Sequence, residues 1–234
     1  MSTIYTDGEY LAKTESWHVE DSPWKAQQIL KMLRRNKLAP ASVAEIGCGA
    51  GVILSELADA DELKDARFEG YDISPQAIEL ASKIDRPNIR FFCQDLLDEG
   101  DENHFDLLLQ MDVFEHVPDY IGFIEKCRAK ADYVMYHIPL EIHVSSVLQK
   151  RFMRSRAEVG HLHYFSAETA LATLKDTGHE VVDYFYTSAA LGLFHKHPGV
   201  KKAIANGPRW ALSRVSPGMA ARLLGGFSLM VLAK

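Results

Sequence analysis

A glycine-rich turn is the first feature of this sequence whose residue types and spacing could do chemistry. Three glycines alternate directly after an apolar run, in the segment Glu45-Ile-Gly-Cys-Gly-Ala-Gly51. Glycines in this position let the backbone turn tightly and approach a ligand, with free amides of the following helix facing it. A dinucleotide fingerprint would place glycine or alanine at position 52, where this chain has Val52. The turn therefore predicts a nucleotide-like ligand and disfavours NAD.

Two acidic residues follow at the spacing that a nucleoside site requires. Asp72 lies 21 residues after Gly51 and ends a second apolar run, while Asp95 follows a third. An acid in the first position can accept both hydroxyls of an adenosine ribose, and a carboxylate beside a backbone amide in the second can bind adenine. Each has a structural reading, with the glycines needed for packing, Asp72 as a helix N-cap and Asp95 as a turn residue. Their order along the chain favours an adenosine ligand instead.

Alternating strand and helix patterns must position these residues. Apolar runs predict strands at 42–46, 67–71, 88–92, 105–110, 133–138, 181–187 and 227–233. Helical spacing predicts helices at 23–36 (with Ser22 as N-cap), 52–57, 74–84, 118–130 and 167–177. Strands that alternate with helices favour an α/β fold, a three-layer αβα doubly wound sheet that is mostly parallel and carries an antiparallel edge strand. The glycine turn and both acids then lie at the carboxyl ends of successive strands.

Length and composition bound the protein class. The chain has 234 residues, 47% of them hydrophobic, which predicts a single domain over 1–234. A net charge of -6 argues against a protein built to coat nucleic acid. Without an apolar run that suits a signal peptide or a membrane span, we expect a cytoplasmic protein. Three cysteines, which match no zinc spacing, are expected to be reduced and buried: Cys48, Cys93 and Cys127.

Charge is distributed unevenly along the sequence. Residues 184–234 carry seven basic residues and no acidic one, whereas residues 1–183 carry a net charge of -13. A second basic cluster occupies 150–156. Such runs are either solvated faces or a rim that attracts an anionic substrate or an acidic membrane surface.

Several motifs together make the sequence resemble class I S-adenosylmethionine-dependent methyltransferases. These are Ala44-Glu-Ile-Gly-Cys-Gly-Ala-Gly51, Tyr71-Asp-Ile-Ser74, Gln94-Asp-Leu96, Phe105-Asp-Leu107 and Met111-Asp-Val-Phe-Glu-His-Val-Pro-Asp119. The resemblance covers about residues 40–187 in order. It implies a seven-stranded sheet with strand order 3-2-1-4-5-7-6, S-adenosylmethionine as methyl donor and S-adenosylhomocysteine as product.

The resemblance also implies roles for single residues. The methionine end of the donor would be held by the first motif, the ribose by the second and the adenine by the third, with the sulfonium side lined from the fourth strand. The implied cofactor-binding residues are Glu45, Gly47, Cys48, Gly49, Gly51, Asp72, Ile73, Asp95, Leu96, Gln110, Met111 and Asp112. A helical lid over about 1–38 would add Trp17.

Histidines are the candidates for a general base, because an imidazole titrates near neutral pH. His116 is expected on the rim towards which the methyl group points, and His163 closes the insert 140–165, which is expected to cover the substrate; we take these two as catalytic. Further candidates are His137, His143 and His161. The alternative is that these histidines cap helices or fill the lid.

A divalent metal ion is a second possibility at the same place. Asp112-x-x-Glu115-His116 resembles the Glu-x-x-Glu-His of small-RNA 2′-O-methyltransferases and ubiquinone O-methyltransferases, with His163 as a fourth ligand. Many relatives carry a similar Glu-His-Val without any ion, and position 112 is Asp. We therefore assign no metal ligands.

The acceptor is less well defined than the donor. The sequence favours a small or carrier-linked acceptor, with anionic acceptors among the candidates, methylated at oxygen, because motifs of amino-group and arginine methyltransferases are missing. The insert pairs apolar residues with basic ones at helical spacing, which suits a lid over an anionic or lipid-linked acceptor or a helix on a membrane surface. RNA methylation and a non-catalytic, donor-binding scaffold are the alternatives.

Overall fold

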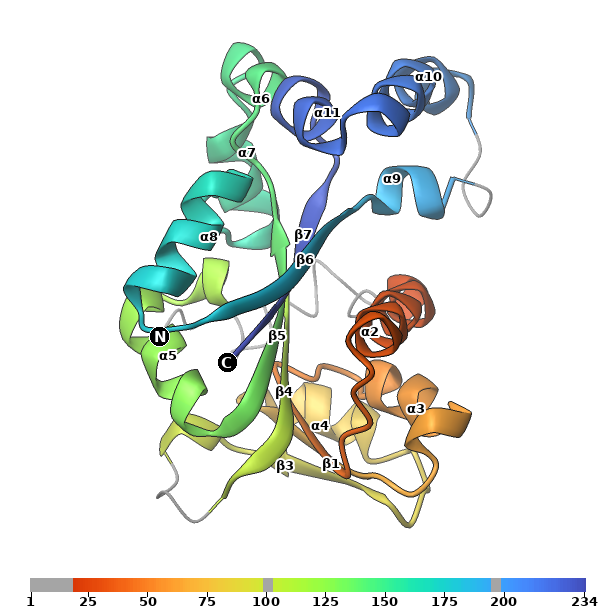
Figure 1. Cartoon of the computed structure of the whole chain (residues 1–234), viewed down its shortest axis with the longest axis vertical. Coiled ribbons are helices and arrows are strands. Elements are labelled where there is room, and N and C mark those ends of the chain that lie inside the picture. The colour runs from red at the N-terminus through yellow and green to blue at the C-terminus, as the bar shows by residue number, and fades with distance from the viewer. Residues whose placement is uncertain (1–18, 99–102, 195–198) are drawn as a thin grey trace.

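A single mixed sheet forms the centre of the computed structural model, which describes residues 19–98, 103–194 and 199–234 (Figure 1). Its seven strands have the order β3-β2-β1-β4-β5-β7-β6, as expected. Their bounds are β1 Ser42–Ile46, β2 Arg67–Asp72, β3 Ile89–Cys93, β4 Phe105–Met111, β5 Ala131–Pro139, β6 Val181–Thr187 and β7 Ser228–Ala233.

Strand pairing confirms the doubly wound topology. β3, β2, β1, β4 and β5 are parallel, whereas β7 is antiparallel to both β5 and β6. Every residue of β1 is buried, and so is all of β4 except Asp106. Burial on both faces explains why these strands appear in the sequence as unbroken apolar runs.

Helices cover both faces of the sheet and complete three layers (Figure 1). α2 (Ser22–Asn36) and α3 (Val52–Ala58) pack on one face, and α5 (Tyr120–Ala129) and α8 (Ala167–Asp176) on the other. α4 (Pro75–Ala81) connects β2 to β3. Two apolar cores result, one on each side of the sheet. The parallel strands therefore end together at one edge, where the predicted ligand residues follow them.

The start of α2 differs from the expectation. Asp21, not Ser22, is the N-cap residue, and its side chain makes no capping hydrogen bond. Ser22 is already helical and buried, because Pro23 at the next position suits the first turn of a helix. The described part of the expected lid over 1–38 consists of α2 and a short 3-10 helix before it, Val19–Asp21. Trp17 lies outside the described residues.

Five further helices lie outside the alternating strand and helix pattern, two of them in the insert, where the sequence showed helical spacing. The insert 140–165 contains α6 (Val144–Leu148) and α7 (Arg151–Val159), and α9 (Ala189–Gly192), α10 (Val200–Val215) and α11 (Pro217–Leu224) connect β6 to β7. α6, α7, α10 and α11 gather at one end of the molecule, at the top of Figure 1. No described helix is long and apolar enough to cross a bilayer.

One prediction about the cysteines is wrong. Cys48 and Cys127 are buried free thiols, but Cys93 is exposed. It is the last residue of β3, an edge strand, and only the first residue of that strand is fully buried. An edge strand has a neighbour on one side only, so its side chains are covered less completely.

Candidate active site

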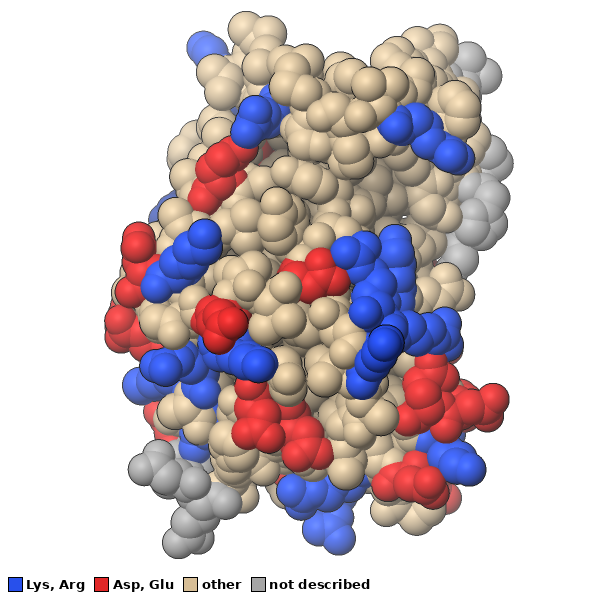
Figure 2. All heavy atoms as spheres, in the orientation of Figure 1, with Lys and Arg blue, Asp and Glu red and all other residues tan. Residues whose placement is uncertain are grey.

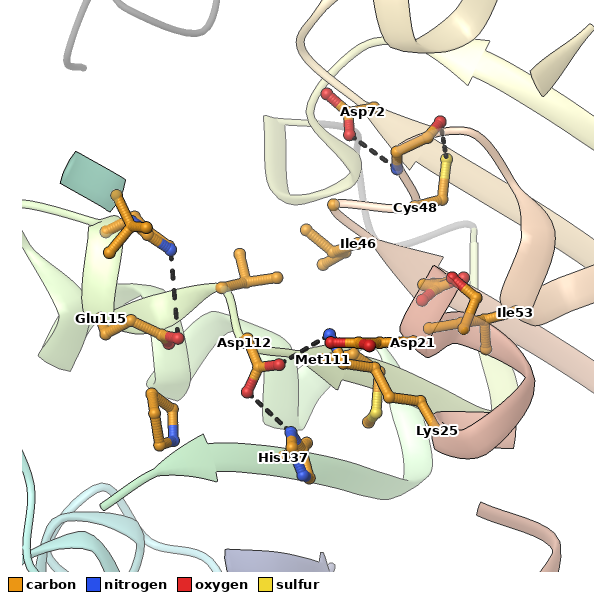
Figure 3. Close-up of a pocket in the computed structure, with 18 of the residues that line it drawn as sticks. Asp21, Lys25, Ile46, Cys48, Ile53, Asp72, Met111, Asp112, Glu115 and His137 are labelled. Atoms are coloured by element: carbon orange, nitrogen blue, oxygen red, sulfur yellow. Dashed lines mark hydrogen bonds and ion pairs between the residues drawn. The ribbon is translucent and has the colours of Figure 1, made fainter. Parts of the chain in front are cut away.

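A cavity of about 500 Å³ opens at the carboxyl ends of β1, β2, β4 and β5. This volume lies in the range of roughly 300–1,000 Å³ that small-molecule and cofactor sites occupy. Figure 3 shows Asp72 and Glu115 on opposite sides of the cavity, with Asp112 between Lys25 and His137. We call the Asp72 side the donor end and the Glu115 side the acceptor end.

The glycine turn forms the wall of the donor end. Gly47, Gly49 and Gly51 have φ of 72°, 54° and 74°, a conformation that only glycine adopts without strain. A Cβ on Gly47 would lie 2.8 Å from Val113, and a Cβ on Gly51 would collide with the Phe91 ring. Gly47, Cys48 and Gly49 line the cavity, whereas Gly51 instead starts α3 and packs beside Phe91.

Asp72 lies where an acid can bind the ribose of a nucleoside. It ends β2, and its carboxylate accepts hydrogen bonds from the Gly49 amide at 3.0 Å and the Ser74 amide at 2.8 Å. Burial raises the Asp72 pKa, and these amides partly offset the increase. Ile73 and Asp95 line the same wall. Leu96 is fully buried in the apolar core and is not among the lining residues.

A buried charged cluster separates the two ends of the cavity. The Lys25 ammonium lies 2.7 Å from one Asp112 oxygen, and His137 Nδ1 lies 2.7 Å from the other. His137 Nε2 in turn bonds the Thr187 hydroxyl at 2.9 Å. Burial would raise the Asp112 pKa, but His137 and Lys25 outweigh burial and hold it well below its usual range. Asp112 follows the last residue of β4 and adopts φ 60°. This backbone conformation places its carboxylate between Lys25 and His137.

Lys25 was missed by sequence reasoning, although a signal was present. It lies four residues before Ile29 on the face of α2 that packs against the sheet. Burial alone would lower its pKa, yet the adjacent Asp112 carboxylate raises it. Lys25 is the one Lys or Arg among the cavity-lining residues in the described part of the chain.

Glu45 lies close to this cluster and is buried at the end of β1. Burial raises its pKa from 4.5 to about 8, against the opposing effect of Lys25. Glu45 therefore holds a proton at neutral pH. Met111 also lines the cavity, while Gln110 is buried in β4 and is not a lining residue.

Four ionisable side chains meet at the acceptor end. The His116 and His161 rings have centroids 4.7 Å apart, and His116 Nε2 lies 4.0 Å from a Glu115 oxygen. Burial lowers the His116 pKa to about 4, so this imidazole is neutral at pH 7. Glu115 is fully buried, and burial raises its pKa well above the usual range. Neither Glu115 oxygen has a hydrogen-bond partner among the described residues.

Glu141 fixes the orientation of His161. Its carboxylate lies 2.6 Å from His161 Nδ1 and accepts a second hydrogen bond from the Ser155 hydroxyl at 2.6 Å. Burial would raise the Glu141 pKa, but these two hydrogen bonds lower it. An ionised Glu141 keeps the proton on Nδ1, which leaves the Nε2 lone pair of His161 available to a ligand.

The remaining histidines lie elsewhere. His163 Nε2 bonds the Val117 carbonyl at 3.0 Å, and its ring packs on Tyr120, so it is not among the lining residues. His143 caps α6 by accepting a hydrogen bond from the Ser146 amide. His161, two residues before His163, lies at the acceptor end instead. Sequence alone could not distinguish the two, because both belong to the same irregular segment before α8.

The acceptor end also fits a divalent metal ion. Ligand atoms of Glu115, His116 and His161 lie within 4.8 Å of one another. A buried carboxylate without a partner costs about 1–3 kcal/mol or more, and a cation would supply that partner. Two imidazoles and a carboxylate suit zinc or manganese, and Glu141 behind His161 is the outer-shell carboxylate typical of metal-bound histidines. Asp112 is engaged by Lys25 and His137 instead.

The chain is similar in sequence to known methyltransferases. A family model described as a methyltransferase domain matches residues 20–184, more than two thirds of the chain. The ubiquinone biosynthesis O-methyltransferase of Haemophilus ducreyi is 27% identical over 152 residues, 56% of this chain and 63% of that protein. The malonyl-[acyl-carrier protein] O-methyltransferase of Acetivibrio thermocellus is 28% identical over 102 residues, 43% of this chain and 35% of that protein. The chain thus spans less than two thirds of the length of these relatives.

Solved structures share the fold. The crystal structure of magnesium protoporphyrin IX methyltransferase from Synechocystis, with bound S-adenosylhomocysteine, superposes with a TM-score of 0.60. Sequence identity is 16%, and the superposition covers 90% of this chain and 82% of that one. Likeness at this identity establishes the fold.

Proposed function

Because the chain belongs to the class I S-adenosylmethionine-dependent methyltransferase family, we propose that it transfers the donor's methyl group to a hydroxyl oxygen held at the acceptor end. The observation that carries the proposal is the cluster of Glu115, His116, Glu141 and His161 across the cavity from Asp72. The acceptor is a small or carrier-linked molecule.

At the donor end, each part of S-adenosylmethionine has a matching group. Asp72 accepts the ribose hydroxyls, and Asp95 lies beside the adenine. Lys25 pairs with the methionine carboxylate, since it is the one lining cation of the described residues and its ion pair with Asp112 holds it in the cavity. Glu45 pairs with the ammonium group when it loses its proton. The sulfonium then lies beside Met111 and Asp112, facing the acceptor end.

Methyl transfer requires alignment and removal of one proton. The acceptor oxygen attacks the methyl carbon in line, the carbon–sulfur bond breaks, and its electron pair stays on sulfur as a neutral thioether. His161 Nε2 takes the hydroxyl proton, and the Glu141 carboxylate stabilises the imidazolium that forms. Holding the two reactants in line supplies most of the rate enhancement.

A divalent cation, when bound, would be held by Glu115, His116 and His161 and would lower the pKa of the acceptor hydroxyl. In that case His161 is a ligand, and Glu141 acts on it from behind. Removal of the cation distinguishes the two modes. Chelation should abolish turnover if a cation is required and leave it unchanged if His161 acts alone.

An oxygen acceptor is favoured over nitrogen because the site supplies groups that remove a proton. Both named relatives above are O-methyltransferases, one of which acts on malonyl-[acyl-carrier protein]. A phenol or an acid, free or attached to a carrier, suits a cavity with a buried, neutral Glu115 that can donate a hydrogen bond.

The test is calorimetry followed by a transfer assay. We expect S-adenosylmethionine and S-adenosylhomocysteine to bind and NAD not to bind, and Asp72→Ala to abolish binding while leaving the circular dichroism spectrum unchanged. Radiolabelled donor is then supplied with phenolic, carboxylic, amine and RNA acceptors. Transfer to an amine would contradict the oxygen assignment, and transfer to RNA would contradict the small or carrier-linked acceptor. Donor binding without transfer to any acceptor would support the scaffold alternative.

A further inference from the structure

The end of the molecule formed by α6, α7, α10 and α11, here called the helical end, exposes an unusual share of the apolar surface. Nine of the thirteen exposed large hydrophobic side chains of the described residues lie on these four helices. The most exposed are Leu148, Met153, Ile204 and Val215, at 77%, 70%, 71% and 84%. Side chains this exposed protrude into solvent, which distinguishes them from the walls of a groove.

These side chains follow helix faces. Val144, Val147 and Leu148 share one face of α6, opposite the buried Ser146. Met219 and Leu223 share one face of α11, opposite the buried Ala221. α6 packs beside both α7 and α11, and α11 packs beside α10. The helical end is therefore a set of adjoining amphipathic helices whose apolar sides have no covering element among the described residues.

The same helices carry most of the positive charge. They contain eight Lys or Arg residues and one acid, Glu158, which gives a net charge of +7. The whole chain has -6, so the rest of it carries -13. Figure 2 shows the upper end as mostly tan with scattered blue and a red patch at its left, whereas red and blue mix over the lower part. A positive helical end on a chain that is otherwise negative would orient the molecule on a negatively charged surface.

We propose that the helical end docks on the surface of an anionic lipid bilayer. Apolar side chains insert at the level of the headgroups while Lys and Arg contact lipid phosphates, as in interfacial amphipathic helices. A second copy of the chain is a poor occupant, because two faces of +7 repel each other. An acidic carrier protein would be attracted by charge but would leave the protruding apolar side chains without a matching groove.

Docking in this orientation brings the acceptor end of the cavity to the bilayer. Ser155 and Val159 on α7 line the cavity, while Met153 and Arg154 of the same helix are exposed. A bilayer-bound acceptor would then enter beside α7. Vesicle binding does not rest on the proposed methyl transfer, so the two can fail separately.

The experiment measures co-sedimentation of the full chain with vesicles, without donor. Vesicles of phosphatidylcholine alone are compared with an equal mixture of phosphatidylcholine and phosphatidylglycerol. We expect binding to the anionic vesicles, weakened by added salt, and little binding to the neutral ones. Arg151→Gln combined with Arg214→Gln should lower the partition coefficient roughly 25-fold, at about five-fold per cation.

A second pair of variants tests insertion. Leu148→Ser combined with Val215→Ser should lower partitioning by more than roughly ten-fold, without loss of folding, because both side chains are exposed. Lys83→Gln combined with Arg90→Gln is the matched control for charge, because Lys83 before β3 and Arg90 within it are both exposed. This pair should leave the partition coefficient near that of the unsubstituted protein. Equal binding to both kinds of vesicle, or binding unaffected by either helical-end pair, would overturn the proposal. So would capture by an acidic carrier protein without vesicle binding.

Discussion

Burial gives the carboxyl groups around the cavity different protonation states. Glu45 and Glu115 are pushed towards the neutral form because burial removes their hydration and Lys25 offsets that loss only in part. Asp112 is equally deep, yet Lys25 and His137 keep it ionised. The free protein thus presents neutral acids that can ionise when a cationic ligand arrives.

Donor affinity should increase with pH through Glu45. Its pKa is about 8 in the free protein, and the donor's ammonium and sulfonium would lower it in the complex. Binding therefore releases a proton, and affinity increases up to about ten-fold per pH unit until pH reaches the free-protein pKa of about 8. Calorimetry across this range in buffers of different ionisation enthalpy measures both the Kd and the proton count.

Glu45→Gln is the matched control for this pH dependence. It keeps the size of the side chain and removes the titration, so the Kd ratio of the two proteins isolates Glu45 from the donor's own amino group. A constant ratio across the range would exclude Glu45 as the titrating group.

His161 and His163, two residues apart in the insert, should differ in their effect on turnover. His161→Ala should lower kcat by roughly 10²–10⁴-fold at unchanged donor Kd, because it removes the proposed base. Glu141→Gln should lower it by roughly 10–100-fold by freeing the imidazole. Single-turnover kinetics on an identified acceptor make the measurement.

His163→Ala serves as the comparison, since its ring contacts Tyr120 and the Val117 carbonyl outside the cavity lining. Its kcat should stay near that of the unchanged protein. A larger loss in His163→Ala than in His161→Ala would transfer the role of base back to His163, which the sequence favoured.

Among the elements, the turn between β1 and α3 depends most strongly on its residue types. Gly51→Ala adds a Cβ at φ 74° against the Phe91 ring and should destabilise the protein by about 2–4 kcal/mol. Gly199→Ala, at the extended N-cap position of α10 with open space around it, should instead change the free energy of unfolding by less than about 1 kcal/mol. Urea unfolding of both variants tests the contrast, and equal effects would contradict the role of the Phe91 contact.

Two helices connect the cavity to the rest of the molecule. α2 packs on one face of the sheet and places Lys25 beside Asp112. α7 reaches the cavity with Ser155 and Val159 and reaches solvent with Met153. A ligand at either end of the cavity therefore contacts a helix that is not part of the nucleotide-binding strands.

The molecule as a whole is polarised, with the helical end at +7 and the remainder at -13. The nucleotide-binding strand ends and the helical end are separate regions that meet at the cavity. Under the two proposals, donor binding belongs to the sheet and delivery of the acceptor to the helices, and transfer and vesicle binding can each be measured without the other.

The positions of the strands along the chain and the donor end followed from the sequence because they depend on local patterns, whereas the strand order was implied by the family resemblance. Apolar runs, glycines at positive φ and acids at strand ends are set by residues close together in the chain, and the structure has all seven strands where they were expected. The exposed Cys93 and the cap at Asp21 departed from expectation because each depends on neighbours distant in sequence or on a single dihedral choice.

The sequence by itself determined the fold, the glycine turn and the placement of Asp72 and Asp95, since parallel strands must end at one edge. Only the tertiary structure decided which histidine meets Glu115, that Glu141 orients it, and that Lys25 lies over Asp112. Those contacts join the end of β4, the insert and α2. His161 lies in the irregular segment of the insert before α8, which has no periodicity from which the direction of a side chain can be predicted. Long-range packing, which no local pattern encodes, assembled the acceptor end.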